Sequence, residues 1–566
     1  MKSRDELKRQ LKQIDHKGYK AYKVLEDCYE FGTYRLSIDH VQGDPFATPS
    51  RVRIFYRNGG NIPAEYFSTR VRKIAAEDYL LRRLHRSLRA EAGGGRKGSG
   101  KSGLVTACRV GQEVLERTAV LISAEQIEVR IEVGFPAYGR TIAAGELEEI
   151  LFEMLPVVAK KSFAFCPEME RELKRAVYLA DDQEFIRNEL EKRGLVSFVA
   201  DGSVLPRESG ISQRPMKTAV AFRSPDSLAV TLRLPHRGVV RGMGIRRGVT
   251  VIVGGGYHGK STLLKAIERG VYDHISGDGR EYVITDSTAF KLRAEEGRCI
   301  HQENISMFIN HLPSRADTVR FTTENASGST SQAANTIEAL ACRSRVLLID
   351  EDTSATNFMV RDEVMAKLVA DEKEPITPFI RRVRALYEEM GISTVLVVGS
   401  SGAYLSVADT VVQMDCYEAK DVTKRAMELA EQYGEAAEKK GGNSRPDGSV
   451  PEKKEWLSYA VRRQRIEKMR VHGWDTLSLD KSEIDLRYLE QITDETQTAA
   501  LGYILQYILE RLADGKKNAV QLAHEAYLKL QKDGLVSMTP PNYGAGCPAA
   551  VREQEILAGL VRYRLL

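Results

Sequence analysis

The chain has 566 residues, of which 42% are hydrophobic and 28% are charged, and its formal net charge is only +5 at pH 7. This length predicts more than one domain, and the composition is that of a globular protein, not of a polycation. No run of about 18 apolar residues occurs, so we expect no transmembrane helix and no membrane contact.

The N-terminus and the cysteines favour a cytoplasmic location. The first residues, MKSRDELKRQLKQ, are charged throughout and lack the apolar core of a signal peptide, and Ser3-x-x-Glu6 instead predicts a capping box that opens a helix. The seven cysteines are scattered and form no CxxC pair. Neither a disulfide framework nor a zinc site is therefore expected, and a reducing compartment fits best.

The first region, residues 1–205, mixes strand-like and helix-like segments and predicts an α+β domain. Its segment 51–101 is strongly basic and carries interleaved aromatics such as Phe55 and Tyr79. Cations neutralise phosphates and aromatic faces stack on unpaired bases, which indicates nucleic-acid binding; a solvated helix face over core aromatics is the simpler alternative. The residues that we expect to contact nucleic acid are Arg82, Arg83, Arg86, Arg96, Lys97 and Lys101.

A Walker A pattern, G-x-x-x-x-G-K-[ST], occurs at Gly95–Ser102 inside this basic segment. A helical pattern over 75–90 precedes it and a strand-like stretch over 104–110 follows it. A loop entered from a helix and left by a strand cannot aim a helix dipole at a phosphate, so we reject this copy as a nucleotide site. It is either a mobile surface turn or a cationic loop that grips nucleic-acid phosphates.

The second region, residues 206–420, predicts an α/β domain with a buried, mostly parallel sheet. Short β-rich runs alternate with helical stretches, and the runs are Leu228–Leu234, Val249–Val253, Val346–Ile349 and Thr394–Val398.

The second Walker A copy, GGGYHGKS, follows the apolar run Val249–Val253 and precedes a helical pattern, which is the order that phosphate binding needs. Glycines let the backbone amides curl around the phosphates, Lys260 reaches the β and γ phosphates, and the Ser261 hydroxyl ligates Mg²⁺. The expected ATP-binding residues are Gly254, Gly255, Gly256, Tyr257, His258, Gly259, Lys260, Ser261 and Thr262.

Two further elements complete a nucleotide site. In Arg345–Glu351, four apolar residues predict a buried strand with Asp350 at its tip as a Mg²⁺ ligand and Glu351 as the group that orients or deprotonates water. A helix N-cap is the alternative for this acidic pair. The Ser/Gly turn at 326–332 leads a helical stretch and is either a second phosphate-binding device or a plain N-cap, and its position between the other two elements favours the first. The order of the three elements is that of ABC ATPases.

At this point the chain resembles the "predicted ATPase of the ABC class" proteins, soluble bacterial proteins related to a kinetoplastid mitochondrial ATPase associated with RNA editing. The resemblance covers roughly residues 30–420. The segments that carry it are Gln42–Ser50, Gly254–Leu264, Gly277–Glu281, Ala326–Ala334, Leu348–Asp362 and Glu374–Phe379.

The resemblance implies a role for each element of the site. Ser327, Gly328 and Ser329 stand as the signature turn that faces the γ-phosphate of a second subunit, so that ATP joins a homodimer. Residues 354–357 stand as the D-loop and Gln302 as a weak candidate for the Q-loop. The chain departs from the pattern at Asp352, where a proline is usual, and at Ser400, where a switch histidine is expected. Hydrolysis could therefore be slow.

The remainder divides into a polar linker, residues 421–455, and a helical domain, residues 456–566. A second basic run, Arg462–Arg470, follows the linker. The apolar spacing from Leu501 to Leu512 has a 3.6-residue period and marks one helix face, which either packs in the core or forms a partner surface.

We therefore expect an α/β P-loop NTPase of the ABC-ATPase type with an N-terminal α+β domain and a C-terminal helical domain. The expected function is ATP binding and hydrolysis with Mg²⁺ by a homodimer that acts on nucleic acid, and the resemblance favours RNA. A nucleotide-gated dimer switch that docks a protein partner is the alternative, and a small-molecule kinase is a third possibility.

Overall fold

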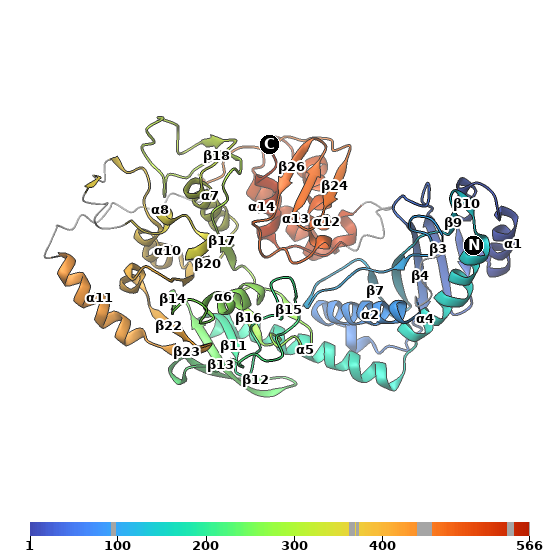
Figure 1. The fold of residues 1–566 in the computed structure, drawn as a ribbon, viewed down its shortest axis with the longest axis horizontal. Helices are drawn as coiled ribbons and strands as arrows, with labels where there is room; N and C mark the ends of the chain where they lie inside the picture. The colour runs from blue at the N-terminus through green and yellow to red at the C-terminus, as the bar shows by residue number, and fades with distance from the viewer. Residues whose placement is uncertain (92–97, 362–367, 370–372, 439–455, 540–547, 565–566) are drawn as a thin grey trace. The chain divides into compact units, whose positions relative to one another are not determined.

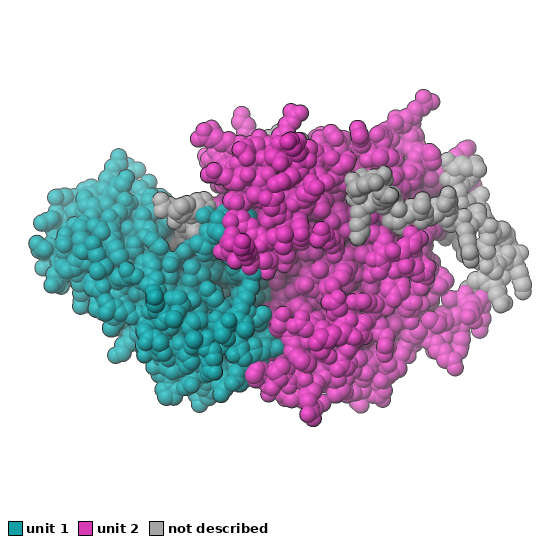
Figure 2. Space-filling model, turned by 180° about the vertical axis from the view of Figure 1, so that it is seen from behind, with its two compact units in different colours: residues 1–181, 534–550 teal, residues 182–533, 551–566 magenta. Residues whose placement is uncertain are grey.

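A computed structural model of the chain describes residues 1–91, 98–361, 368–369, 373–438, 456–539 and 548–564. The chain divides into two compact units, which Figure 2 colours separately: residues 1–181 with 534–550, and residues 182–533 with 551–566. Among the described residues, none of the helices combines the length and the apolar character needed to cross a bilayer.

Unit 1 is built on a seven-stranded sheet of order β1-β2-β3-β4-β8-β5, with β7 paired to β8 (Figure 1). Its strands are β1 (Lys2–Ser3), β2 (Cys28–Glu30), β3 (Tyr34–His40), β4 (Ser50–Arg57), β5 (Val105–Thr106), β7 (Val120–Ile122) and β8 (Gln126–Val133). Strict alternation in β8 buries Ile127, Val129 and Ile131, so one face of the sheet forms the core.

The helices of unit 1 are α1 (Arg4–Ile14), α2 (Arg70–Glu91), α3 (Ala144–Glu148) and α4 (Leu155–Phe163). The expected helix start at Ser3 is confirmed, because the Ser3 hydroxyl accepts a hydrogen bond from the Glu6 amide at 3.1 Å. Helix α5 (Pro167–Lys192) leads from this unit into the next.

Unit 2 contains a six-stranded sheet of order β17-β20-β21-β14-β22-β23. The strands are β14 (Val249–Val253), β17 (Phe290–Leu292), β20 (Val346–Asp350), β21 (Ser393–Val397), β22 (Thr410–Asp415) and β23 (Glu418–Asp421). All neighbours pair in parallel except β22 and β23, and Val251 lies opposite both Leu396 and Val411. The expected buried, mostly parallel sheet is confirmed.

A second, antiparallel sheet of order β12-β13-β11-β16 adjoins this core. It consists of β11 (Leu195–Ala200), β12 (Ala229–Leu234), β13 (Gly238–Arg246) and β16 (Val283–Thr285). Because β11 is buried throughout and pairs with β13 and β16, residues 182–205 belong to unit 2. The expected domain boundary at residue 205 therefore differs from the observed one at 181.

The sequence led us to expect a purely helical C-terminal region, but the structure also contains strands there. A three-stranded antiparallel sheet, β24 (Met469–His472), β25 (Thr476–Leu479) and β26 (Ser482–Asp485), precedes helices α12 (Glu495–Tyr507), α13 (Ala519–Asp533) and α14 (Glu553–Val561). In β25 and β26 buried positions alternate with partly or fully exposed ones, a short period-2 signal that is weaker than the helical period of 501–512. The apolar stripe is buried from Leu501 to Leu509, so this helix face packs in the core and does not form an exposed partner surface.

The expected linker is also partly structured. Helix α11 (Thr423–Glu438) occupies the start of segment 421–455, and residues 439–455 lie outside the described part of the chain. The Asp421 carboxylate accepts hydrogen bonds from the amide and the hydroxyl of Thr423, and these bonds favour the start of the helix at this residue. The sequence led us to expect only a polar linker in this segment.

Buried ion pairs fasten the chain's end to helix α7 (Gly328–Ala341) within unit 2. The Arg562 guanidinium lies 2.6 Å from Glu295 and donates to Asn335 at 2.9 Å, and Arg298 pairs with Glu338. Burial alone would raise the pKa of Glu295, but Arg562 and Arg298 lower it overall. The Arg562 and Glu295 side chains are each only 3% exposed, so water cannot solvate either charge if its partner is removed.

Replacement of Arg562 by Met should therefore leave Glu295 buried without its closest cation and reduce the free energy of unfolding of unit 2 by about 3–5 kcal/mol. Both tryptophans, Trp456 and Trp474, lie in unit 2, so urea unfolding followed by tryptophan fluorescence reports this change. The control is Arg564→Met, because the Arg564 side chain is 50% exposed and its ion pair is long. Equal effects of the two substitutions would contradict the role of the buried pair.

Candidate functional site

The loop Gly254–Gly259 joins the end of β14 to the start of α6 (Lys260–Arg269). Gly254 and Gly259 have φ of +143° and +99°, and a Cβ on Gly254 would lie 2.3 Å from the Met414 carbonyl oxygen. Helix α6 has no side-chain cap, so the amides of its first turn are directed toward the loop. A loop of this shape at a helix N-terminus is an anion-binding device.

Lys260 is the first residue of α6, and its side chain folds back over the loop. Its ammonium donates hydrogen bonds to the carbonyls of Gly254 at 2.7 Å and Gly255 at 2.9 Å. Ser261, the next residue of α6, is exposed. The ammonium is thus held over the loop, and an exposed hydroxyl follows it in the first turn of α6.

The acidic pair lies at the same edge of the sheet. Asp350 ends the buried strand β20, which is separated from β14 by β21 alone. Its carboxylate accepts a hydrogen bond from the Asp352 amide at 3.2 Å, so Asp350 caps the short 3₁₀ turn that follows, as the N-cap alternative stated. Ser261 and Asp350 offer the hard oxygen ligands that Mg²⁺ prefers.

Glu351 is oriented by the turn that follows β21. Its carboxylate accepts hydrogen bonds from the amides of Gly399 at 2.5 Å and Ser400 at 3.1 Å, and from the Ser400 hydroxyl at 2.6 Å. Although partial burial opposes it, these bonds and the nearby Lys260 lower the pKa of Glu351. Ser400, which stands where a histidine was expected, therefore positions the acidic residue.

The Ser/Gly turn opens helix α7. Ser327 is the N-cap and is exposed, and its hydroxyl accepts the Thr330 amide at 3.4 Å; Gly328 and Ser329 form the first helical turn. The Gln332 amide group binds the Ser354 hydroxyl at 2.9 Å and the Ala355 amide at 2.8 Å. Helix α7 is thus tied to the segment after Glu351.

Gln302 lies elsewhere. It is in β18 (Ile300–Glu303), which pairs with β19 (Phe321–Thr323) in a separate two-stranded sheet. Its φ is +45° and its amide donates to the Thr322 hydroxyl at 3.0 Å. The structure therefore does not bring Gln302 into the sheet that carries the P-loop.

The hairpin of β22 and β23 also contacts the P-loop, which sequence reasoning missed. The Cys416 amide donates to His258 Nδ1 at 2.9 Å, and the Tyr417 amide donates to the His258 carbonyl at 3.2 Å. His258, Asp415 and Cys416 could hold a cation by residue type, but His258 Nδ1 already accepts an amide and Asp415 pairs with Lys420 at 2.6 Å. These groups thus serve the turn.

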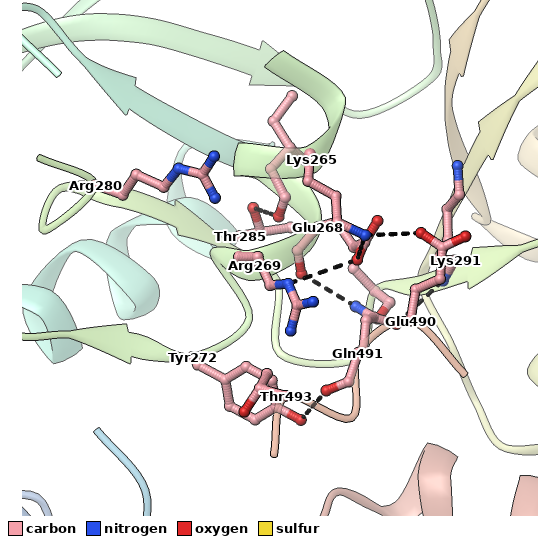
Figure 3. A network of polar contacts seen from close by, with 12 residues as sticks. Lys265, Glu268, Arg269, Tyr272, Arg280, Thr285, Lys291, Glu490, Gln491 and Thr493 are labelled. Atoms are coloured by element: carbon pink, nitrogen blue, oxygen red, sulfur yellow. Dashed lines mark hydrogen bonds and ion pairs between the residues drawn. The ribbon is translucent and has the colours of Figure 1, made fainter. Parts of the chain in front are cut away.

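The opposite side of α6 is fixed by the segment before α12, as Figure 3 shows. Glu490 lies 2.8 Å from Lys265 of α6, and Gln491 donates to the Glu268 carbonyl at 3.2 Å and accepts the Lys291 amide at 3.1 Å. Burial opposes ionisation, yet Lys265 and other nearby cations lower the pKa of Glu490 to about 2. No sequence pattern marked these residues.

The arginines that were expected to contact nucleic acid are engaged within unit 1. Arg82 binds Asp78 at 2.6 Å and the Gly111 carbonyl at 2.6 Å, Arg83 donates to the Lys161 carbonyl at 3.0 Å, and Arg86 pairs with Glu172 at 3.3 Å. They hold α2 against its neighbours.

The basic glycine loop after α2 is only partly described. Arg96 and Lys97 lie outside the described residues, and Lys101 is half-buried. Ser102 is fully buried and bonds the Ser99 carbonyl at 2.6 Å. The expected order of a helix before this loop and a strand after it is confirmed by α2 and β5.

Three family models match consecutive parts of the chain. The model of the P-loop domain of ABC ATPases matches residues 169–447, which makes this an ABC-class P-loop ATPase domain. The model described as ATPase of the ABC class N-terminal matches residues 4–166, and the MRB1590 C-terminal domain matches residues 468–566. The chain therefore belongs to the ABC-class ATPases related to MRB1590, as the motifs led us to expect.

Two individual proteins show similarity over part of the chain. An uncharacterized protein of Methanocaldococcus jannaschii is 31% identical over 270 residues, which are 46% of this chain and 59% of that protein. The solved structure of cbiO1 from Clostridium perfringens, part of the ABC transporter complex cbiONQ, is 12% identical, with a TM-score of 0.25 over 44% of this chain and 96% of that chain. At this TM-score the likeness carries no argument.

The conformation of the loop predicts a difference between two of its glycines. Gly254→Ala should lower the free energy of unfolding of unit 2 by about 1–3 kcal/mol in the absence of nucleotide, because the new methyl group meets the Met414 carbonyl at a disfavoured φ. Gly256→Ala is the control, since nothing lies within 4 Å of its Cβ position. The same tryptophan-detected unfolding tests both; a stable Gly254→Ala variant would contradict this loop geometry.

Proposed function

We propose that the chain binds ATP with Mg²⁺ at residues 254–262 and hydrolyses it as a homodimer. One arrangement supports this most: an uncapped helix N-terminus with Lys260, and the acidic pair Asp350 and Glu351 at the same edge of one parallel sheet. Amides, ammonium and carboxylates then act on a triphosphate from different sides.

In this proposal the loop and the first turn of α6 bind the phosphate chain through backbone amides. The Lys260 ammonium, which lies over the loop carbonyls, turns to the β and γ phosphates. Ser261 and Asp350 would hold Mg²⁺, which supplies charge neutralisation on the phosphates when bound. Lys260 must turn to reach the phosphates, whereas Glu351 is already held by Gly399 and Ser400 before ATP binds.

Glu351 places the attacking water in line with the γ-phosphate. A carboxylate with a lowered pKa is a weak base, so its contribution is to orient the water more than to deprotonate it. Ser400 restrains this carboxylate through both its amide and its hydroxyl. A missing switch histidine and a weak base both favour slow turnover.

The second subunit enters through the signature turn. The start of α7 at Ser327–Ser329, where Ser327 is exposed, has the partial positive charge of a helix N-terminus and suits the γ-phosphate of another copy. Gln332 connects this helix to residues 354–355 beside Glu351, so dimer contact and water-positioning group are linked.

Glu351→Gln should keep ATP bound, because the amide preserves the shape but orients water poorly, and should therefore trap a dimer. Light scattering during size exclusion with ATP and Mg²⁺ is expected to show twice the monomer mass. Lys260→Ala in the same background should bind ATP too weakly to dimerise. A Glu351→Gln variant that stays monomeric with ATP bound would exclude the proposed sandwich.

We also propose that the protein binds single-stranded nucleic acid, and that the run Arg462–Arg470 carries the contact in place of α2. Arg462, Arg463, Arg465, Lys468 and Arg470 are exposed, and Glu467 is the only acidic residue within the run. Trp474 in the following turn is 47% exposed and offers a stacking surface. The family resemblance favours RNA. A dimer switch that docks a protein partner is the alternative.

The four substitutions Arg462→Gln, Arg463→Gln, Arg465→Gln and Lys468→Gln, made together, should weaken RNA binding. Fluorescence anisotropy with single-stranded RNA at several salt concentrations should show a salt slope smaller by about 3, since each lost phosphate contact contributes roughly 0.7. The control neutralises four exposed cations of unit 1, Arg9, Lys12, Lys17 and Lys20. No RNA binding by the wild type at low salt would favour the protein-docking alternative.

A further inference from the structure

We infer that Tyr417, at the tip of the β22–β23 hairpin, stacks on the base of the nucleotide whose phosphates lie in the P-loop. The ligand class is therefore a nucleoside triphosphate whose base is recognised through its ring face. This inference rests on the proposed ATP binding at residues 254–262 and adds the part of the site that holds the base.

The order of the strands fixes the side on which the base must lie. β14, which leads into the P-loop, has β21 and then β20 on one side and β22 and then β23 on the other. Asp350 ends β20 and Glu351 follows it, so this pair marks the γ-phosphate end of the proposed site. A phosphate chain that extends away from that end carries its nucleoside toward β22 and β23.

At that side, Tyr417 is held directly against the loop. Its amide donates to the His258 carbonyl at 3.2 Å, and the amide of the preceding Cys416 donates to His258 Nδ1 at 2.9 Å. A Cβ on Gly259 would lie 3.1 Å from Cδ1 of the Tyr417 ring. The ring therefore lies over the glycine that immediately precedes Lys260.

The ring is also accessible and its backbone is strained. Tyr417 is 53% exposed, so packing against Gly259 leaves part of the aromatic surface open. Cys416 and Tyr417 have φ of +48° and +71°, a conformation in which Asn or Gly is common at a hairpin turn and other residues are disfavoured. A large aromatic residue kept at a strained turn beside a phosphate loop is consistent with a ligand contact.

Tyr257, the other exposed tyrosine of this region, lacks such a support. It is fully exposed, with a φ of +64°, so its ring does not pack against the described part of the chain. An aromatic ring that is placed before the base arrives loses less conformational freedom on stacking. The amides of Cys416 and Tyr417 fix the hairpin backbone against His258, and the Tyr417 ring packs beside Gly259.

The test uses the full chain and compares ATP with inorganic tripolyphosphate, which lacks the base. Tyr417→Asn suits the left-handed turn and removes the ring, so the variant should bind ATP about 10-fold more weakly, within the range for loss of one stacking contact. Its affinity for tripolyphosphate with Mg²⁺ should stay within about two-fold of wild type. Tyr417→Phe, the matched control, should bind both ligands as the wild type does.

Titration calorimetry separates the outcomes. Equal losses of ATP and tripolyphosphate affinity would show that Tyr417 only supports the loop, and unchanged ATP affinity would show that the base lies elsewhere; either result overturns the inference while the P-loop proposal stands. ATP binding that survives Lys260→Ala would instead contradict the P-loop proposal, and the stacking inference with it. Retained tripolyphosphate binding shows that the variant's loop is folded.

Discussion

The six-residue turn Gly254–Gly259 is the constraint on which the rest of the ATPase unit depends. To direct backbone amides at an anion, the chain must leave β14 and enter α6 with left-handed glycines at both ends, and the Met414 carbonyl leaves no room for a side chain at the first. Strand β20 places Asp350 and Glu351 beside this turn, and the β22–β23 hairpin closes its other side. The phosphate site is thus built from both sides of one strand.

The C-terminal residues are part of this construction. Glu490 and Gln491 fix α6 from behind, and Arg562 is buried against Glu295 and Asn335 beside α7. Two separate stretches of the C-terminal region, around residues 490 and 562, therefore contact α6 and α7 respectively.

Much of the fold was predictable because its signals are local. The strand–loop–helix around Lys260 and the buried strand ending at Asp350 follow from apolar runs and glycines, and the structure confirms both. Contacts between distant segments were not predictable: Ser400 on Glu351 and Cys416 on His258 depend on strand order. The arginines of α2 illustrate the same limit, since composition marked their charge but not the carboxylates and carbonyls that engage them.

The most direct test of the account is a structure of the protein with Mg²⁺ and a non-hydrolysable ATP analogue. The account predicts that the triphosphate lies along the amides of residues 255–262, with Lys260 turned from the loop carbonyls to the phosphates and the metal between Ser261 and Asp350. An analogue bound at another place, with the Lys260 ammonium still on the carbonyls of Gly254 and Gly255, would contradict it.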